Sequence, residues 1–297
     1  MKRYFSFYAL ILSIALLFSC TSTPEPLPGL TGSSVWQVSR DGNTMYLGGS
    51  IHILREGDFP LPKEFDIAFF RSDALVLEAD TRLMQNPEVA AYLESRMVLP
   101  DGQTLQTILD PETFSMLAAV TLEHGFPIEA VANFKPSMVM MILAMIQLYA
   151  EGFTQEGIDF YYMRKAENQN VAIYFLESVE SQIEMIVSMG EGYENDFVRY
   201  SLQDMANTQM SLAEIVSDWR VGKAASTEEA LRVMQEEWPV IYHSLITARH
   251  DAWMPQIERM LNSGRTYFVI AGLAHMHGPS GLLRLLEDLG YTIEQLR

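Results

Sequence analysis

Two motifs with the same spacing stand far apart in this chain, and each ends in a histidine. The stretch "LGGSIHIL" carries Gly49 and His52, and the stretch "VIAGLAHMHG" carries Gly272 and His275. Each motif follows an apolar run, which predicts a histidine just past the end of a buried strand. Glu78 holds a similar place after the apolar residues "LVL". The sequence therefore predicts two imidazoles and a carboxylate at strand ends.

Ligands bind at the carboxyl ends of the strands in open α/β sheets, so these side chains have a shared place to meet. We expect His52 and His275 to lie within about 10 Å of each other, with Glu78 at the same edge. Two imidazoles and a carboxylate can hold a divalent transition metal, or can act as general bases without one. Glu78 is then either a metal ligand or the base that activates water, and the sequence leaves both roles open.

A single Gly-X-X-His motif is a weak signal, because a histidine at a strand end can also be a hydrogen-bonded structural residue. In each motif the glycine allows a tight turn or the close approach of another segment. We interpret His124, His243 and His250 as structural residues. The chain has no H-E-x-x-H, cysteine pair, phosphate-binding loop or G-x-S-x-G motif.

The elements that must position these residues alternate between strands and helices. The triplet Asp41-Gly42-Asn43 between alternating apolar residues predicts a hairpin near the start. The runs "ALVL", "VAIYF" and "YFVIAG" predict three more strands, and "YTIEQL" predicts a last strand at a sheet edge. Helical patterns fill residues 82–152 and 181–262. We therefore expect an α/β fold with a mixed central sheet built from both chain ends and a large helical insertion.

The segment "SMVMMILAMIQLYA" is apolar on nearly all sides and too short to span a bilayer. It predicts a fully buried helix, with a partner-binding or membrane-contact helix as the alternative. Its methionines fit core packing better than a metal site.

The first residues have the pattern of a targeting segment. Residues 1–20 begin with Lys2 and Arg3, continue with a short apolar run and end in "LFSC", which predicts a lipoprotein signal peptide with Cys20 as the lipidated residue. The alternative is an ordinary exported protein with a free thiol. Residues 21–33 predict a flexible tether, and residues 34–297 a single domain. We expect a lipid-anchored, extracytoplasmic protein of a bacterial envelope, in the outer membrane where there are two.

The net charge of −18 argues against a nucleic-acid partner, because binding to phosphates needs clustered Lys and Arg side chains. The 297 residues, 48% of them hydrophobic, are enough to bury a sizeable core. The lipid anchor is the only membrane contact that we expect, and the sequence leaves the oligomeric state open.

Four stretches together resemble the TraB/GumN family, which is related to the Tiki metalloproteases. They are "VWQVSRDGNTMYLGGSIHIL", "LVLEAD", "EGIDFYYMRKAENQNVAIYFLESVESQ" and "YFVIAGLAHMHGPSGLLRLLEDLGYTIEQL". The resemblance runs from about Ser34 to Leu296 and implies a fold similar to that of erythromycin esterases. Tiki members are metal-dependent proteases that cut extracellular peptides with manganese or cobalt, and zinc is also possible here.

The family's metal and catalytic positions match His52, His275 and Glu78. The family also carries an arginine on a helix before the last buried strand, and Arg249 is its best match here. The residue after Arg249 is His250, where asparagine is common in the family. An arginine in this place can bind a substrate carboxylate or stabilise developing negative charge, and an ordinary helix ion pair is the alternative.

Two functions follow as hypotheses. The first is a lipid-anchored, metal-dependent hydrolase that cleaves extracytoplasmic peptides or another small polymer. The second is a non-catalytic protein that binds and sequesters a peptide or glycan in the same cleft.

Overall fold

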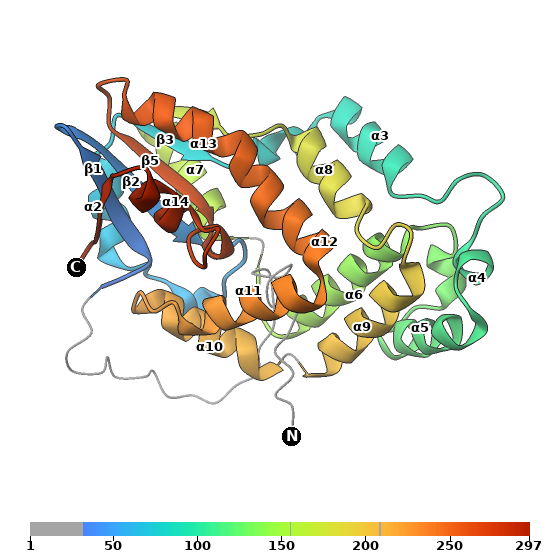
Figure 1. The fold of residues 1–297 in the computed structure, drawn as a ribbon. Coiled ribbons are helices and arrows are strands. Elements are labelled where there is room, and N and C mark those ends of the chain that lie inside the picture. Colours follow the sequence, from blue (N-terminus) through green and yellow to red (C-terminus); the bar gives the residue numbers. More distant parts are fainter. Residues whose placement is uncertain (1–31, 155, 208) are drawn as a thin grey trace.

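The computed structural model describes residues 32–154, 156–207 and 209–297, and only the backbone of residues 206, 207 and 209–213. Within these residues the strands form one six-stranded sheet in the order β4-β3-β5-β2-β1-β6 (Figure 1). The strands are β1 (Val35–Arg40), β2 (Asn43–Ser50), β3 (Ala74–Leu77), β4 (Ala172–Phe175), β5 (Tyr267–Gly272) and β6 (Thr292–Gln295). The expected α/β fold with a mixed sheet is confirmed.

Strands from the two ends of the chain lie side by side in this sheet. β2 and β5 are parallel, with Ser50 opposite Gly272, and β5 is also parallel to β3. β1 runs antiparallel to both β2 and β6, so the first hairpin and the last strand complete the far edge. Every residue of β3 and β5 is buried, as expected for parallel strands that are covered on both faces.

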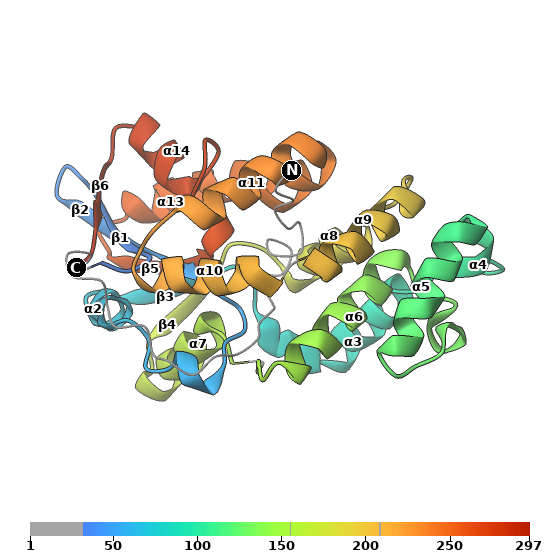
Figure 2. The same cartoon turned by 90° about the horizontal axis from the view of Figure 1, so that it is seen from below.

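Helices cover both faces of the sheet. α2 (Lys63–Phe70) and α7 (Ile158–Gln169) pack on one face, and α13 (Ala248–Leu261) and α14 (Leu282–Asp288) pack on the other (Figure 2). On the first face, Phe65 of α2 and Tyr162 of α7 contact each other and Phe268 of β5. These aromatic rings fix the helices against the central strand.

The helical insertion forms most of the other half of the molecule (Figures 1 and 2). Its longer helices are α3 (Pro87–Arg96), α5 (Pro111–Glu123), α6 (Pro136–Ala150), α8 (Val179–Val187), α9 (Glu194–Asn207), α10 (Gln209–Arg220) and α11 (Ala225–Glu237). The short helical segments are α4 (Leu105–Ile108), α12 (Pro239–Tyr242), η1 (Glu56–Asp58), η2 (Thr81–Gln85), η3 (Ile128–Val131), η4 (His243–Thr247) and η5 (Leu273–His275). α3, α5 and α6 each begin with a proline in the first turn, which is a common helix-starting signal.

The prediction of a fully buried helix over the methionine-rich segment is correct only in part. α6 lies where expected, and most of its residues are buried. Its last turn reaches the surface, where Tyr149 is 45% exposed, and Met141 is only partly buried because it borders a pocket. The helix packs against α8 and α9 on its other sides, so apolar residues on nearly every side do not require complete burial.

The predicted signal peptide, Cys20 and nearly all of the predicted tether lie outside the described residues. Ser33, the last residue of that tether, is buried, and its carbonyl accepts a hydrogen bond from Gln295 Nε2 at 2.9 Å. Among the described residues, no helix combines the length and the apolar character needed to cross a membrane.

Candidate functional site

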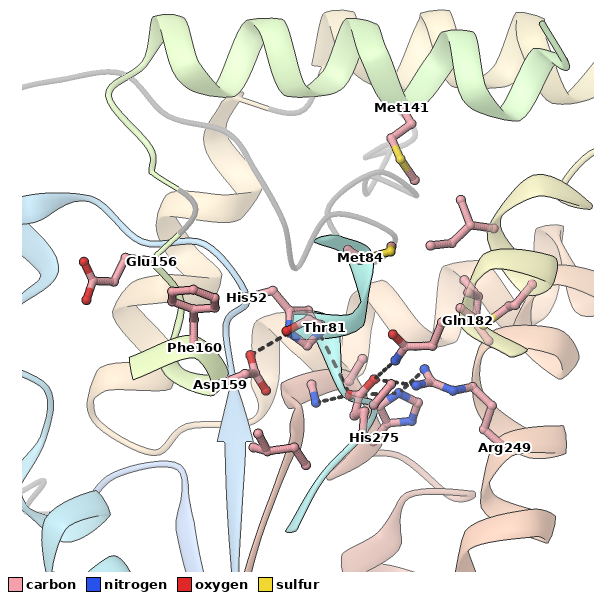
Figure 3. Close-up of a pocket in the computed structure, with 18 of the residues that line it drawn as sticks. His52, Thr81, Met84, Met141, Glu156, Asp159, Phe160, Gln182, Arg249 and His275 are labelled. Carbon is pink, nitrogen blue, oxygen red and sulfur yellow. Dashed lines mark hydrogen bonds and ion pairs between the residues drawn. The ribbon is translucent and has the colours of Figure 1, made fainter. Parts of the chain in front are cut away.

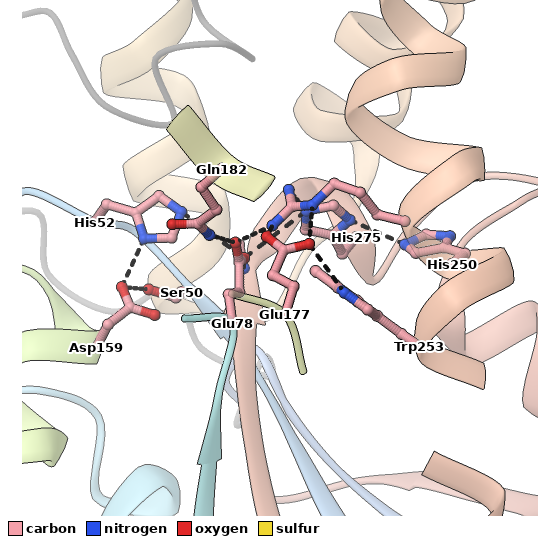
Figure 4. A network of polar contacts seen from close by, with 11 residues as sticks. Ser50, His52, Glu78, Asp159, Glu177, Gln182, His250, Trp253 and His275 are labelled. Atoms are coloured by element: carbon pink, nitrogen blue, oxygen red, sulfur yellow. Dashed lines mark hydrogen bonds and ion pairs between the residues drawn. The ribbon is translucent and has the colours of Figure 1, made fainter. Parts of the chain in front are cut away.

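Three neighbouring strands bring the predicted residues together at one edge of the sheet. His52 follows β2, His275 follows β5, and Glu78 follows β3, so the central position of β5 places all three in one cluster (Figure 4). Glu78 Oε1 lies 3.9 Å from His52 Nε2 and 3.8 Å from His275 Nε2. The expected convergence of the two histidines and Glu78 is therefore present in the structure, whereas their chemical roles stay predictions.

The two motif glycines, Gly49 and Gly272, are needed because neighbouring atoms lie too close for a side chain, and not because their backbone angles require glycine. A Cβ on Gly272 would lie 3.2 Å from His52 Nε2 and 3.4 Å from Glu78 Oε1, so a side chain here would crowd the cluster. The N–H of Gly272 donates to Glu78 Oε1 at 2.7 Å. A Cβ on Gly49 would lie 2.6 Å from Leu273 Cδ1, so this glycine makes room for the chain that leads to His275.

Arg249 of α13 reaches the same cluster. Its Nη2 donates to Glu78 Oε2 and, at 2.6 Å, to Glu177 Oε1, and its Nε donates to Glu177 Oε2 at 3.1 Å. The guanidinium carbon also lies 4.4 Å from the centre of the Trp253 ring, whose Nε1 donates to Glu177. Glu78 is buried, and the side chains of Arg249 and Glu177 are only 11% and 13% exposed. One largely enclosed cation is thus shared by two anions, which is a stronger arrangement than a surface ion pair.

A directed chain of hydrogen bonds fixes the proton positions on two histidines. Arg249 Nη1 lies 2.7 Å from His275 Nε2, and arginine can only donate, so this nitrogen carries no proton. The proton of His275 is therefore on Nδ1, which donates to His250 Nε2 at 2.9 Å. His250 then donates from Nδ1 to the carbonyl of Ser280 at 2.6 Å. Both imidazoles are neutral in this arrangement.

His52 is oriented by a separate carboxylate. Its Nδ1 lies 2.7 Å from Asp159 Oδ2, and the same oxygen accepts a hydrogen bond from Ser50 Oγ. An ionised carboxylate can only accept, so Nδ1 of His52 donates and its Nε2 is directed at Glu78. Asp159 lies in the first turn of α7, which begins directly after Gly157.

The surroundings of the cluster raise the pKa of one histidine and lower the pKa values of Glu78 and of the other two histidines. Burial works against a charged His52, but the Asp159 carboxylate, assisted by Glu78, outweighs burial and raises the pKa of His52 to about 9. Burial alone would raise the pKa of Glu78, but Arg249 and the two histidines hold it well below its usual range. Burial, with Arg249 beside it, lowers the pKa of His275 well below its usual value, and burial lowers the pKa of His250 to about 4.

A pocket of about 880 Å³ opens onto this cluster (Figure 3). Its floor is formed by the strand ends with His52, Glu78 and His275, and its walls come from the helical insertion. Much of the wall is apolar: Met84, Met141, Met185, Ile186, Met189, Leu245 and Ile246. Such a site, with an apolar wall and a few converging polar groups, is typical of a small-molecule or peptide pocket.

Leu245 and Ile246 belong to η4, a single π-helical turn. It joins α12 to α13, the helix that carries Arg249. π-Helical turns of this kind are frequent at functional sites.

The donor atoms of the cluster are largely committed to one another, which bears on a metal ion. His275 Nε2 accepts from Arg249, and Glu78 accepts from Gly272, Gln182 and Arg249. In the part of the chain that the structure describes, no group of three or more His, Cys, Asp or Glu side chains is arranged to hold a metal ion. The side chains as placed therefore do not fit the expected manganese, cobalt or zinc ion, and the need for a metal stays a prediction.

Sequence reasoning gave no site role to several residues of the network. The sequence-based predictions name neither Asp159, Glu177, Gln182 nor Trp253, and they treat His250 as structural. His250 is buried and contacts His275 directly, so it supports a site residue. Asp159 stands in the stretch "EGID", where an acidic residue after glycine at a helix start was the available signal.

The fold and the cluster define an α/β protein with a polar site at the carboxyl edge of a mixed sheet, beneath a helical insertion. The TraB/PrgY/gumN family model matches residues 34–295. The chain therefore belongs to this family, as the resemblance of its sequence motifs predicted.

Two curated relatives resemble the chain over most of their length. The uncharacterized protein YbaP of Escherichia coli (strain K12) is 24% identical over 255 residues, which cover 84% of this chain and 90% of that protein. The uncharacterized protein YbaP of Shigella flexneri is 24% identical over 246 residues, which cover 82% and 87%. No solved structure matches the chain.

Proposed function

We propose that this protein is a hydrolase of peptide-type bonds in which His52 activates water. The observation that carries this proposal is the pairing of His52 Nδ1 with Asp159 Oδ2 at 2.7 Å, on the floor of a pocket. A carboxylate that holds one imidazole nitrogen orients the other toward the reacting atoms and stabilises the imidazolium that forms. The second nitrogen of His52, Nε2, lies 3.9 Å from Glu78 Oε1, whereas His275 Nε2 is engaged by Arg249 Nη1 at 2.7 Å.

The other residues have supporting roles in this reaction. Glu78 stays ionised because Arg249 holds its pKa down, so it is a weak base and acts by fixing the orientation of His52 and water. The gap of 3.9 Å between Glu78 Oε1 and His52 Nε2 is wide for a hydrogen bond, and a water between two such groups is a common arrangement. Neutral His52 takes a proton from that water as its oxygen attacks the carbonyl carbon, and returns it to the leaving group.

The pocket walls support a substrate with apolar groups. Met84, Met141, Met185 and Met189 line the cavity beside the polar floor. Methionine side chains are flexible and adapt to varied apolar shapes, so a peptide with an apolar side chain next to the cleaved bond fits this site. The peptide class itself comes from the resemblance to the Tiki proteases.

The protein acts outside the cytoplasm, held to the envelope by a lipid on Cys20. Support for this part comes from the sequence of residues 1–20 alone. The resemblance implies a divalent metal held by His52, His275 and Glu78, but the reaction proposed here uses none, and the need for one is tested separately below.

Binding without turnover is the second candidate, and one observation favours it. The charged groups of the floor already satisfy one another: Arg249 is paired with Glu78 and Glu177, and His52 with Asp159. A site of this kind can hold a peptide or glycan against its apolar wall without reacting.

The two functions are separated by incubating the domain that begins at residue 32 with a diverse peptide library and identifying products by mass spectrometry. We expect cleavage by the wild type, a loss of at least about 100-fold in His52→Gln, and a comparable loss in Asp159→Asn. Parallel reactions with a chelator and with manganese, cobalt or zinc show whether a metal is needed.

A matched control is Ser50→Ala, which removes one hydrogen bond to Asp159 and keeps its charge. This variant should keep most of the activity. Saturable peptide binding with no products in any reaction would instead establish the binding function.

A further inference from the structure

Arg249 occupies the atoms of His275 and Glu78 that a metal ion at this site would use. Its Nη1 lies 2.7 Å from His275 Nε2, and its Nη2 donates to Glu78 Oε2. These contacts take up the imidazole lone pair and one of the carboxylate oxygens that a metal ion would need from His275 and Glu78. Figure 3 shows the Arg249 side chain reaching toward His275.

A metal ion and this guanidinium cannot use the same atoms at once. A transition metal binds imidazole nitrogen and carboxylate oxygen at about 2.0–2.2 Å, and it needs the lone pairs free. The ring of His275 is held in one orientation, because its Nδ1 donates to His250 Nε2. His250 in turn donates from its Nδ1 to the Ser280 carbonyl. Glu78 Oε1 is likewise held by the Gly272 N–H.

The position of Arg249 is fixed from the other side as well. Glu177 accepts from both Nε and Nη2 of the guanidinium, and Trp253 stacks against it while donating to the same carboxylate. This bidentate pairing holds the guanidinium plane in one orientation. Displacing Arg249 would leave Glu177 buried without its cation.

We infer that Arg249 is the resident cation of this site and takes the place of a divalent metal, so that a metal ion binds tightly only when the guanidinium has been removed or displaced. His52, His275 and Glu78 are then latent ligands whose lone pairs are released when Arg249 is absent. The inference concerns metal binding and holds whether or not the protein turns over a peptide.

The test measures binding of Mn²⁺ and Zn²⁺ to chelator-treated protein by titration calorimetry, with Mn²⁺ also followed by electron paramagnetic resonance. Arg249→Met should bind one ion per chain at least about tenfold more tightly than the wild type. Arg249→Lys, which keeps a cation near the two carboxylates, should bind as weakly as the wild type. Added Mn²⁺ should raise the melting temperature of Arg249→Met by several degrees and leave that of the wild type unchanged.

Three further variants make the result specific. Arg249→Met/Glu78→Gln should lose the gained affinity, because it removes the carboxylate ligand. Arg232→Met removes an exposed arginine of α11 that is paired with Glu229 and Glu236, and this variant should gain no affinity. If Arg249→Met does not fold, Arg249→Met/Glu177→Gln removes one of the two uncompensated carboxylates and serves in its place.

The inference is overturned if the wild type binds one metal ion as tightly as Arg249→Met and loses it in His275→Ala. It is also overturned if folded Arg249→Met, or its substitute, gains no affinity. The peptide-library experiment detects cleavage products, whereas the experiment here measures metal affinity. The hydrolase proposal can therefore fail while the inference about Arg249 holds, and the inference can fail while the hydrolase proposal holds.

Discussion

The proton positions of individual residues determine what this site can do. Arginine can only donate and the Ser280 carbonyl can only accept, so the chain between them leaves His275 and His250 neutral with defined tautomers. His52 is not part of this series of hydrogen bonds, and its Nδ1 pairs with Asp159 instead. Two histidines that follow the same motif therefore have different properties: His275 is a fixed acceptor, and His52 is the one that can exchange a proton.

Hydrolysis should become faster as the pH rises above neutrality. The pKa of His52 is raised to about 9, so at pH 7 most of the protein carries the imidazolium, which cannot accept a proton. The neutral fraction, and with it kcat/KM, should rise about tenfold per pH unit from pH 7 to 8 and level off only above pH 9.

The pH profile of kcat/KM for a peptide product of the library checks this. In Asp159→Asn the rising limb should move to lower pH, because the carboxylate that raises the pKa is gone, whereas Ser50→Ala should keep the wild-type limb. A rate independent of pH between 6 and 9 would assign the base role to another group.

At the scale of elements, the start of α7 determines the orientation of His52. α7 begins after Gly157, whose added Cβ would lie 2.0 Å from the carbonyl oxygen of His52, and it carries Asp159 in its first turn. The N–H of Ile158 donates to the carbonyl of Ile51, which ties the same turn to the segment after β2. The glycine thus lets a helix end approach the strand end closely enough for Asp159 to reach His52.

Gly157→Ala should destabilise the protein and disturb the site together. The new methyl group would overlap backbone atoms of His52, which cannot rotate away, and overpacking of this kind costs about 1–3 kcal/mol. Urea unfolding and library cleavage measure the two effects. Gly57→Ala is the matched control, because its Cβ would have nothing within 4 Å and its φ lies outside the left-handed region. Equal stability of the two variants would contradict the close packing at Gly157.

The end of α6 should make stability depend on pH. Burial raises the pKa of Glu151, which follows the last turn of α6, to about 7. Its Oε2 is buried and has no hydrogen-bond partner among the residues that the structure describes. Its ionisation is thus harder in the folded than in the unfolded protein, where the pKa is near 4.5. The resulting penalty is absent below pH 4.5, grows as the pH rises to 7, and is complete above that.

Glu151→Gln should therefore be more stable than the wild type at pH 8, and the two should converge near pH 4. Each unit of pKa shift corresponds to about 1.4 kcal/mol, so the gain in the free energy of unfolding at pH 8 should not exceed about 3.5 kcal/mol. Unfolding midpoints in urea at the two pH values provide the measurement. If the two proteins differ in stability by the same amount at pH 4 and pH 8, the effect comes from packing and not from the charge of Glu151.

At the scale of the whole molecule, one chain joins a sheet to a helical insertion that walls the pocket. The sheet takes its central pair, β2 and β5, from opposite ends of the sequence. Met141 of α6 and Met185 of α8 come from the insertion between them. In the proposed hydrolase, the insertion would select the substrate, and the sheet edge would present His52 to it.

Cys20→Ser should abolish attachment to the membrane. Lipidation of Cys20 is the predicted anchor, and the described residues contain no helix that could span a membrane. We expect the wild type in the detergent phase with the added mass of a lipid, and the variant either in the soluble fraction or retained with an uncleaved leader. A variant that partitions and weighs as the wild type does, apart from the substituted residue, would disprove the lipid anchor.

The sequence by itself determined the elements and the identity of the central site residues. The Asp41-Gly42 turn, the apolar runs of β3 and β5 and the helix-starting prolines are local signals, so they could be interpreted without the fold. Because the carboxyl ends of parallel strands meet at one edge, placing His52, Glu78 and His275 after three such strands was enough to predict that they converge.

Only the tertiary structure decided how those residues are charged and paired. α13, with Arg249 and His250, packs on one face of the sheet, and α7, with Asp159, packs on the other. No local sequence pattern determines where either helix lies relative to the strand ends. The contact between Arg249 and His275 spans 26 residues and that between Asp159 and His52 spans 107. Packing over such separations sets the proton positions, because a histidine's pKa depends on the charges that the fold places within a few ångströms.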